Sequence, residues 1–282
     1  MPKSSNPNPQ NSIHSLELKS PKINLSKLFD DFYTPAQSRK IRYLVFHHIA
    51  ANSSEEAIAM LRHHRVSAHF LIDEFGEIFA LVREQDIAYH AGHSFWRGEF
   101  ALNQSSIGIE FQNSNPFLQK FSEAQLKSGL LLAEFLIEKY QISLINVVGH
   151  SDIAFNPENF YLDRKQDPSH LFNWQIFAEK NLAVWPLSLS HSNNSADSQN
   201  KDCALLNPLF CLGDQDPKIA KIKENLNKFG YLVRNFDNNF DEEMLCLVRV
   251  FNRRFMPQSF DQKNGLDNWY SGSEEILQNL VF

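Results

Sequence analysis

The segment IRYLVFHH (41–48) combines β-branched and aromatic residues in a nearly continuous apolar run. Such a run is typical of a strand that is buried inside a sheet. The segment SIGIEFQN (106–113) alternates with a period of two and predicts another strand. A third segment, INVVGH (145–150), is expected to be a short strand that leads into a loop. These three segments form the framework of a predicted sheet.

Helices and one hairpin are expected around these strands. A Ser-Ser cap signal opens the segment 53–64, and apolar residues recur at helical spacing through 122–141, so both are predicted helices. Two short apolar runs, 68–72 and 77–82, flank the hairpin signal DEFG (73–76). The order strand, helix, hairpin, strand, helix, strand predicts an α/β fold with a mixed central sheet flanked by helices.

Changes in composition divide the chain into four expected parts. Residues 187–202 are rich in Ser and Asn and lack periodic apolar content, which is typical of a linker. Three segments with helical limits follow, at 216–231, 241–257 and 271–282. The expected parts are a flexible leader (1–35), an α/β domain (36–186), a linker (187–204) and a small three-helix C-terminal module (205–282).

The overall composition excludes several classes of protein. With 43% hydrophobic and 21% charged residues, the 282-residue chain is expected to be soluble and globular. Its net charge of −6 and the lack of a long basic run argue against a nucleic-acid partner. The sequence lacks an apolar run long enough to span a membrane, a signal segment and a lipidation cysteine at the amino terminus, so on sequence alone we expect a cytoplasmic protein. Three cysteines, an odd number without a CxxC pair, argue against a disulfide framework and a thiolate zinc site.

Side chains suited to hydrolytic chemistry stand at the ends of the predicted strands or in the loop after them. Two histidines and one carboxylate on neighbouring strand ends would form a three-ligand zinc site with an open fourth position. A further carboxylate can act as general base, and a lysine can stabilise the oxyanion that forms when water adds to an amide. The residues available for these roles are His47, His48, Glu110, His150, Lys165 and Asp167. Because adjacent strand residues face opposite sides, only one of the first two histidines can join the site, and the strand rule alone does not choose between them.

Several motifs, in order along residues 41–186, resemble the amidase-2 family of zinc N-acetylmuramoyl-L-alanine amidases. The C-terminal module is similar to the helical peptidoglycan-binding domain, through KFGY (228–231) and FNRRFMP (251–257). This pairing is similar to broad-specificity amidases of the Gram-negative envelope. The motifs that carry the family resemblance are VFHHIA (45–50), VSAHFLI (66–72), YHAGHSFWRG (89–98), LNQSSIGIEFQN (102–113), VVGHSDIA (147–154) and RKQDP (164–168).

The resemblance implies a role for each residue of the catalytic site. His47, His150 and Asp167 match the ligands of one Zn²⁺ ion per chain, and the family's ligand position selects the first of the two adjacent histidines. Glu110 matches the base that activates the attacking water, and Lys165 matches the group that stabilises the oxyanion.

A second set of positions is expected to contact or surround the substrate. Trp96 could stack on a sugar face or be a structural plug. His69 could face the substrate or be a packed hairpin residue, and Asp152 could support a histidine ring of the zinc site. The positions that match the family's substrate loop are His90, Ala91, Gly92, Ser94 and Trp96.

The chain departs from the family between its last two motifs. The segment FNPENFYLD (155–163) stands where relatives usually have only a couple of residues. This insertion lengthens the loop that carries Lys165 and Asp167. Our hypothesis from the sequence is that Phe155, Phe160 and Tyr161 form one wall of the cleft.

The resemblance implies hydrolysis of the amide between N-acetylmuramic acid, or its anhydro form, and L-alanine. The expected partners are peptidoglycan and muropeptides, the module is expected to add a second contact to the polymer, and the chain is expected to be a monomer. The alternatives are a peptidoglycan-binding protein of the same fold without activity, and a zinc peptidase that cuts within the stem peptide. The envelope remains an alternative location, since the module resembles that of envelope enzymes.

Overall fold

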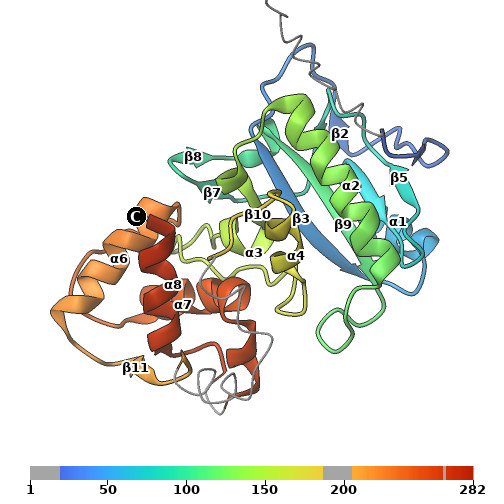
Figure 1. The fold of residues 1–282 in the computed structure, drawn as a ribbon. Helices are drawn as coiled ribbons and strands as arrows, with labels where there is room; N and C mark the ends of the chain where they lie inside the picture. The colour runs from blue at the N-terminus through green and yellow to red at the C-terminus, as the bar shows by residue number, and fades with distance from the viewer. Residues whose placement is uncertain (1–19, 187–204, 263–264, 282) are drawn as a thin grey trace, which may run out of the picture.

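A six-stranded mixed sheet forms the centre of the N-terminal part in the computed structural model, which describes residues 20–186, 205–262 and 265–281 (Figure 1). The strand order is β1-β5-β4-β9-β3-β10, and β4 and β5 form the only antiparallel pair of this sheet among the described residues. The predicted α/β class with a mixed sheet is therefore confirmed. The strands are β1 (Ile23–Asn24), β3 (Tyr43–Ala50), β4 (Phe70–Ile72), β5 (Ile78–Ala80), β9 (Ser106–Asn113) and β10 (Val147–Gly149).

Helices cover both faces of the sheet. Figure 1 shows α2 lying along one face, where it packs on a cluster that includes Phe46 and Ile109. The helix α1 packs on Ile49 and Leu71, whose side chains point to the opposite face. The helices of this part are α1 (Ser54–His63), α2 (Glu123–Tyr140), α3 (His150–Ile153) and α4 (Trp174–Glu179), with the 3₁₀ turns η1 (Leu102–Gln104) and η2 (Leu144–Asn146).

The local signals in the sequence explain where these elements begin and end. Ser53 caps α1 by accepting a hydrogen bond from the Glu56 amide, and Ser122 caps α2 in the same way. The turn of the β4–β5 hairpin contains Gly76 at φ +83°, a backbone conformation that favours glycine. The predicted segments 53–64, 68–72, 77–82 and 122–141 therefore correspond to observed elements.

The expected leader ends earlier than the sequence suggested. Residues 20–35 are part of the fold, because β1 pairs with β5, and β2 (Tyr33–Thr34) pairs with β6 (Ile87–Ala88). Phe29 is also buried in this region. Strands of two residues are too short to produce a periodic pattern, so the boundary predicted at residue 35 was wrong. Residues 1–19 lie outside the described residues.

Three helices form most of the described part of the C-terminal module, and they lie within the segments 216–231, 241–257 and 271–282. Asp216 and Pro217 begin α6, and Gly230 ends it with φ +152°. A short hairpin and a 3₁₀ turn complete the module. Its elements are α6 (Pro217–Phe229), α7 (Glu242–Phe255), α8 (Ser271–Val281), η4 (Pro257–Asp261), β11 (Pro208–Phe210) and β12 (Trp269–Tyr270). The predicted linker 187–204 lies outside the described residues.

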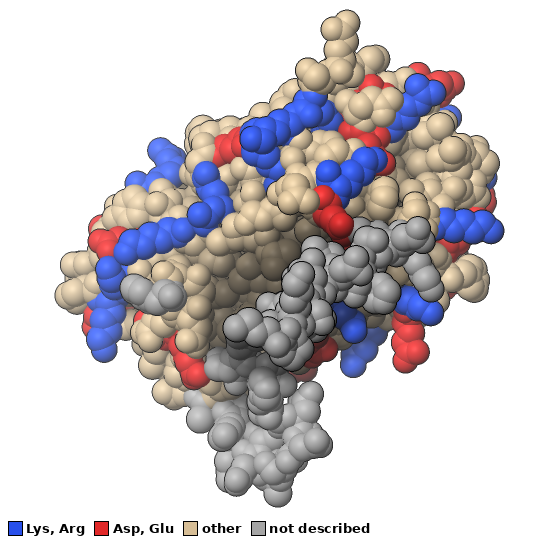
Figure 2. Space-filling view, turned by 45° about the horizontal axis from the view of Figure 1, so that its top comes forward, with Lys and Arg blue, Asp and Glu red and all other residues tan. Residues whose placement is uncertain are grey.

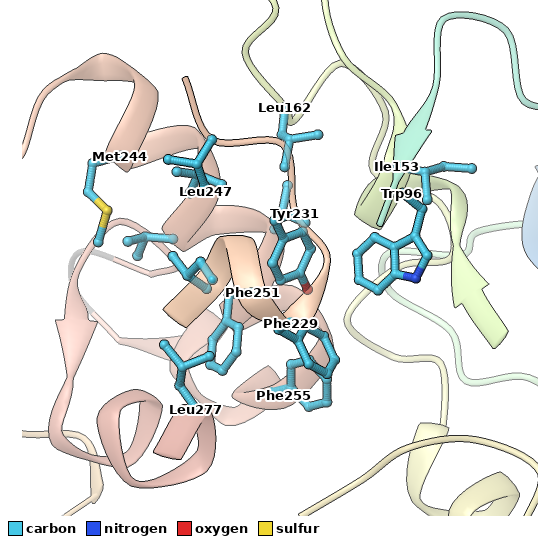
Figure 3. Close-up of a cluster of buried hydrophobic side chains, with 14 of the residues drawn as sticks. Trp96, Ile153, Leu162, Phe229, Tyr231, Met244, Leu247, Phe251, Phe255 and Leu277 are labelled. Carbon is cyan, nitrogen blue, oxygen red and sulfur yellow. The ribbon is translucent and has the colours of Figure 1, made fainter. Parts of the chain in front are cut away.

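One hydrophobic cluster joins the module to the N-terminal part. Val45 and Val148 from the sheet and Trp96 from the hairpin of β7 (Phe95–Trp96) and β8 (Glu99–Phe100) belong to the same cluster as Phe229 and Tyr231. Figure 3 shows the indole of Trp96 facing Tyr231 and Phe229 across the junction. The module is thus docked through a shared core, in contrast to an independent unit on a tether.

Charges of both signs share the surface seen in Figure 2, and the described helices include no membrane span. Figure 2 shows Lys and Arg side chains interspersed with Asp and Glu over one face of the molecule. Among the described residues, no helix is long and apolar enough to cross a bilayer.

Candidate metal and catalytic site

The longest strand pair brings a histidine and a carboxylate together. His47 on β3 lies opposite Glu110 on β9 in the parallel ladder. Both side chains are buried, with 1% and 8% of the residue exposed. Because each strand contains eight residues and the ladder joins them over their whole length, the backbone positions of this pair are rigidly fixed.

Three potential metal ligands converge beside this pair. Ligand atoms of His47, His150 and Asp167 all lie within 4.8 Å of one another. Oδ2 of Asp167 lies 3.0 Å from Nδ1 of each histidine, and the Ser151 amide donates to the Asp167 carbonyl at 2.7 Å. Two imidazole nitrogens and one carboxylate oxygen make a donor set that suits Zn²⁺ in a catalytic site. The residues present therefore fit the metal that the sequence resemblance implies.

The strand alternation separates His47 from His48. The His48 ring packs edge-on against Phe117, and its Nδ1 accepts a hydrogen bond from the Ser169 amide at 3.2 Å. This ring is on the α2 side of the sheet, near Phe121. His47 is therefore the member of the pair that joins the ligand cluster.

Burial keeps the ligand histidine His47 neutral. It lowers the pKa of His47 to about 4, with His150 adding to the effect and Asp167 opposing it. A neutral imidazole has a lone pair available for a metal. Burial likewise lowers the pKa of His90, whose Nδ1 forms a 3.0 Å hydrogen bond with Nε2 of His47.

Glu110 has the properties of a proton acceptor. Its Oε2 is buried and has no hydrogen-bond partner among the described residues. Burial and the Asp167 carboxylate raise the pKa of Glu110 well above its ordinary value, and Lys165 opposes this effect. A buried carboxylate oxygen without a partner is costly unless another group occupies the space beside it. The site is thus shaped for a water molecule or substrate at Glu110.

One cavity of about 490 Å³ joins these groups. The five residues predicted to carry the chemistry all line it, namely His47, Glu110, His150, Lys165 and Asp167. Lys165 is exposed at the rim, where its ammonium group can reach a bound substrate. A lysine and two acidic side chains therefore face the same cavity as the two histidines.

The predicted substrate loop divides into a part at the cavity and a part that supports it. His90 and Gly92 line the cavity. Ala91 is buried, and its carbonyl accepts a 3.2 Å hydrogen bond from Nε2 of His150. This contact fixes the imidazole orientation and leaves Nδ1 facing Asp167, as is common for metal-ligating histidines.

Two residues of the predicted substrate loop are packed inside the protein. Trp96 is fully buried, and its Nε1 donates to the Ile145 carbonyl at 3.0 Å. Ser94 is buried, donates to the Gly92 carbonyl and accepts from the Leu102 amide. The stacking of Trp96 on a sugar does not fit this burial, and the alternative of a structural plug does.

His69 is also a packed residue. It is fully buried, its Nδ1 accepts from the Gly108 amide at 3.0 Å, and its Nε2 lies 2.8 Å from a guanidinium nitrogen of Arg39. Both ring nitrogens therefore have partners inside the fold. The expectation of a substrate contact at His69 does not fit this position.

Asp152 and the inserted segment contact the C-terminal module. Asp152 binds Arg254, so the expected hydrogen bond to a ligand histidine is replaced by an ion pair. Phe160 stacks on Phe155 on one side, and the guanidinium of Arg234 lies over its ring at 5.2 Å. Neither these rings nor Tyr161 line the cavity within the described residues, so the hypothesis that they form a wall of the cleft was wrong.

Several residues that line the cavity were not assigned to the site from the sequence, among them Arg164 and His64. Arg164 lines the cavity and donates to the Phe155 carbonyl at 2.9 Å, and its position beside Lys165 in the RKQDP motif was the available signal. His64, at the exposed end of α1, also lines the cavity together with Met60 and Leu61.

Comparisons with known proteins find similar chains among N-acetylmuramoyl-L-alanine amidases. Residues 37–170 match the family Amidase_2, described as N-acetylmuramoyl-L-alanine amidase. The chain is 37% identical over 240 residues to the N-acetylmuramoyl-L-alanine amidase AmiD of Escherichia coli (strain K12). The matched residues make up 79% of this chain and 77% of that protein. It is 37% identical over 119 residues to the 1,6-anhydro-N-acetylmuramyl-L-alanine amidase AmpD of the same organism. These residues make up 42% of this chain and 60% of that protein.

Two solved structures are also similar to this chain in their three-dimensional fold. The complex of Escherichia coli AmiD with the substrate anhydro-N-acetylmuramic acid-L-Ala-D-γ-Glu-L-Lys has a TM-score of 0.65 and 31% identity, over 87% of this chain and 90% of that chain. AmpDh3 from Pseudomonas aeruginosa in complex with anhydromuramic pentapeptide has a TM-score of 0.64 and 25% identity, over 86% of this chain and 91% of that chain. Both likenesses cover more of the chain than the N-terminal part alone. The resemblance predicted from the motifs is confirmed.

Proposed function

This chain belongs to the N-acetylmuramoyl-L-alanine amidase family, and we propose that it is a zinc enzyme that hydrolyses the amide between N-acetylmuramic acid, or its anhydro form, and L-alanine. The observation that carries this proposal is the convergence of His47, His150 and Asp167 next to the unpaired oxygen of Glu110. Its substrates are peptidoglycan fragments, and its role is the turnover of cell-wall material.

Three side chains hold the metal in this proposal. His47 and His150 would present nitrogen and Asp167 would present oxygen to the ion, and all three side chains line the cavity. Bound Zn²⁺ supplies a Lewis acid that polarises the amide carbonyl and lowers the pKa of the attacking water. The Ala91 carbonyl keeps His150 in the tautomer that this role needs.

Glu110 transfers the protons of the reaction. It accepts a proton from the water that adds to the amide carbon, which is possible because its Oε2 is free to accept a hydrogen bond. It then delivers this proton to the nitrogen of L-alanine as the carbon–nitrogen bond breaks. The products are the lactyl carboxylic acid of the muramic acid and the free amine of the stem peptide, and transfer of the acid's proton to the amine gives the carboxylate and the ammonium group.

Lys165 stabilises the negative charge that develops on the carbonyl oxygen. Its ammonium group lies on the cavity rim, on the same loop as Asp167. A cation beside a partly dry cavity interacts with an oxyanion more strongly than it would in water. This effect is larger in the transition state than in the ground state, which is the condition for catalysis.

The relatives indicate the class of substrate. AmiD and AmpDh3 were both solved with anhydromuramoyl peptides, and these structures resemble this chain over most of its length. A cavity of about 490 Å³ is large enough for the sugar end and the first residues of a stem peptide. We therefore propose muropeptides with anhydromuramic ends as the first substrates to test.

The direct test of this proposal is analysis of the products. The zinc-loaded chain is incubated with a purified anhydromuramoyl tetrapeptide, and the products are identified by mass spectrometry. The expected products are the intact stem peptide and the free sugar. Shortened stem peptides that remain attached to the sugar would indicate a peptidase, and an unchanged substrate would indicate a binding protein.

A further inference from the structure

The helix α7 ends with two consecutive arginines that point into the N-terminal part of the protein. Arg253 and Arg254 are buried, with 5% and 2% of the residue exposed. Consecutive residues on a helix point in directions about 100° apart, so the two guanidinium groups reach different segments. Each of these segments carries at least one proposed zinc ligand.

Arg254 contacts the segment around His150 on both sides of this histidine. Its Nη1 lies 2.7 Å from Oδ2 of Asp152, and its Nη2 donates to the Val147 carbonyl at 3.1 Å. Asp152 also accepts hydrogen bonds from the Gly149 amide at 2.7 Å and the Tyr231 hydroxyl at 3.0 Å. The carboxylate is therefore fully engaged, and two of its partners come from the module.

Arg253 contacts the segment that carries Lys165 and Asp167. Its Nη2 lies 2.8 Å from Oδ1 of Asp163, whose side chain is only 11% exposed. The same loop is held before and after this point. The Asn159 carbonyl accepts from Arg234 at 2.7 Å, and the His170 ring stacks on Phe260 with 3.7 Å between ring centroids.

Beyond the short strand β10, little regular backbone structure supports either segment. The helix α3 contains four residues, which is too short to be stable in isolation. Residues 155–170 form turns and bends without a helix or strand. A zinc site requires ligand positions that are correct to about 0.2 Å, so these segments need support from outside.

Stability alone does not explain the buried ion pairs. Removing two charges from water costs several kcal/mol per ion, so a buried ion pair is weak evidence of a stabilising role. An apolar contact would join the two parts at least as well, and the shared hydrophobic cluster already does so. What an ion pair with several hydrogen bonds adds is a defined direction for the groups that it holds.

We propose that Arg253 and Arg254 are positioning residues for the zinc site, and that the C-terminal module acts as a brace for the two segments that carry His150 and Asp167. This inference rests on the proposed zinc site. It gives the docked module a role in catalysis that does not depend on contact with the cell-wall polymer.

The test uses Arg254→Met in the full chain. The zinc dissociation constant is measured by competition with a chelator, at a temperature well below the unfolding midpoint of every variant. We expect affinity to fall by about 10- to 100-fold, the usual effect of losing a group that orients a metal ligand. The KM of the fully zinc-loaded variant should stay close to that of the unaltered chain, because Arg254 does not line the cavity.

Two control variants separate positioning from general weakening of the module. Arg249→Met removes an ion pair of the same helix, with 2.7 Å between Nε and Oδ1 of Asp267, that stays within the module. Leu277→Ala opens a cavity at a fully packed position of α8 and lowers the unfolding midpoint without touching either segment. Both should bind zinc as tightly as the unaltered chain.

A milder variant keeps the test decisive if Arg254→Met does not fold. Arg254→Lys retains a positive charge beside Asp152 but cannot reach Asp152 and the Val147 carbonyl together, so an intermediate loss of zinc affinity is expected. Unchanged zinc affinity in a folded Arg254 variant would overturn the inference, and so would an equal loss in Leu277→Ala. Failure of the unaltered chain to bind zinc would refute the proposed function instead.

Discussion

The two halves of the candidate site are built on different kinds of structure. His47 and Glu110 lie on β3 and β9, the two eight-residue strands at the centre of the sheet. His150 and Asp167 lie on a four-residue helix and on an irregular loop. The first half is fixed by a continuous ladder of backbone hydrogen bonds, whereas the second depends on contacts with the C-terminal module.

This difference shows how one site can combine residues on rigid strands with residues on irregular segments. The segment 155–163 contacts the module at Asn159, Asp163 and Leu162. Arg164, Lys165 and Asp167, which follow in the same loop, line the cavity. Contacts with the module thus hold the loop whose next residues reach the candidate ligand cluster.

The largest effect is expected from removing a zinc ligand in either half. His47→Ala and Asp167→Ala each leave two ligands, and a metal contribution of several kcal/mol to the transition state corresponds to a loss of about 10³-fold or more in kcat/KM. The measurement is turnover of an anhydromuramoyl peptide together with the zinc content of the purified variant. Full activity in either variant would contradict the assignment of that residue as a ligand.

The next effect concerns the loop-borne half alone. Lys165→Met should lower kcat by about 10²- to 10³-fold, as expected for the loss of one group that stabilises an oxyanion. The KM should change much less, because the charge on the carbonyl oxygen develops only in the transition state. Lys165→Arg is the matched control and should retain part of the activity, while a change confined to KM would assign this lysine to ground-state binding.

The smallest effect on catalysis is expected at the junction with the module. Trp96→Ala removes a fully buried indole that packs on Phe229 and Tyr231, so the free energy of unfolding should fall by about 3–5 kcal/mol. The KM of the folded variant should be unchanged. Denaturant unfolding and steady-state kinetics test both statements, and a raised KM at unchanged stability would restore the sugar-stacking role for Trp96.

The sequence predicted the strands and helix ends that depend on residues close to one another along the chain. The strands that contain His47 and Glu110 and the caps at Ser53 and Ser122 have local signals, and the structure contains all of them. The choice of His47 over His48 came from the family motif, and the geometry explains it through the alternation of strand residues.

Features that depend on distant partners could not be predicted in this way. The contact between Asp152 and Arg254 joins residues that are 102 positions apart, and no local pattern relates them. Tryptophan is a residue type that often stacks on sugars. Only the position of the module shows that Tyr231 packs against the Trp96 ring.

The most direct test of the account is to measure zinc content and turnover together in Glu110→Gln. Glu110 is the proposed base and makes no contribution to the ligand set, so the variant should bind zinc as the unaltered chain does. Its turnover of an anhydromuramoyl peptide should fall by at least about 10²- to 10⁴-fold, the usual contribution of a general base. Retained turnover with zinc bound would contradict the central claim that this buried carboxylate moves the proton.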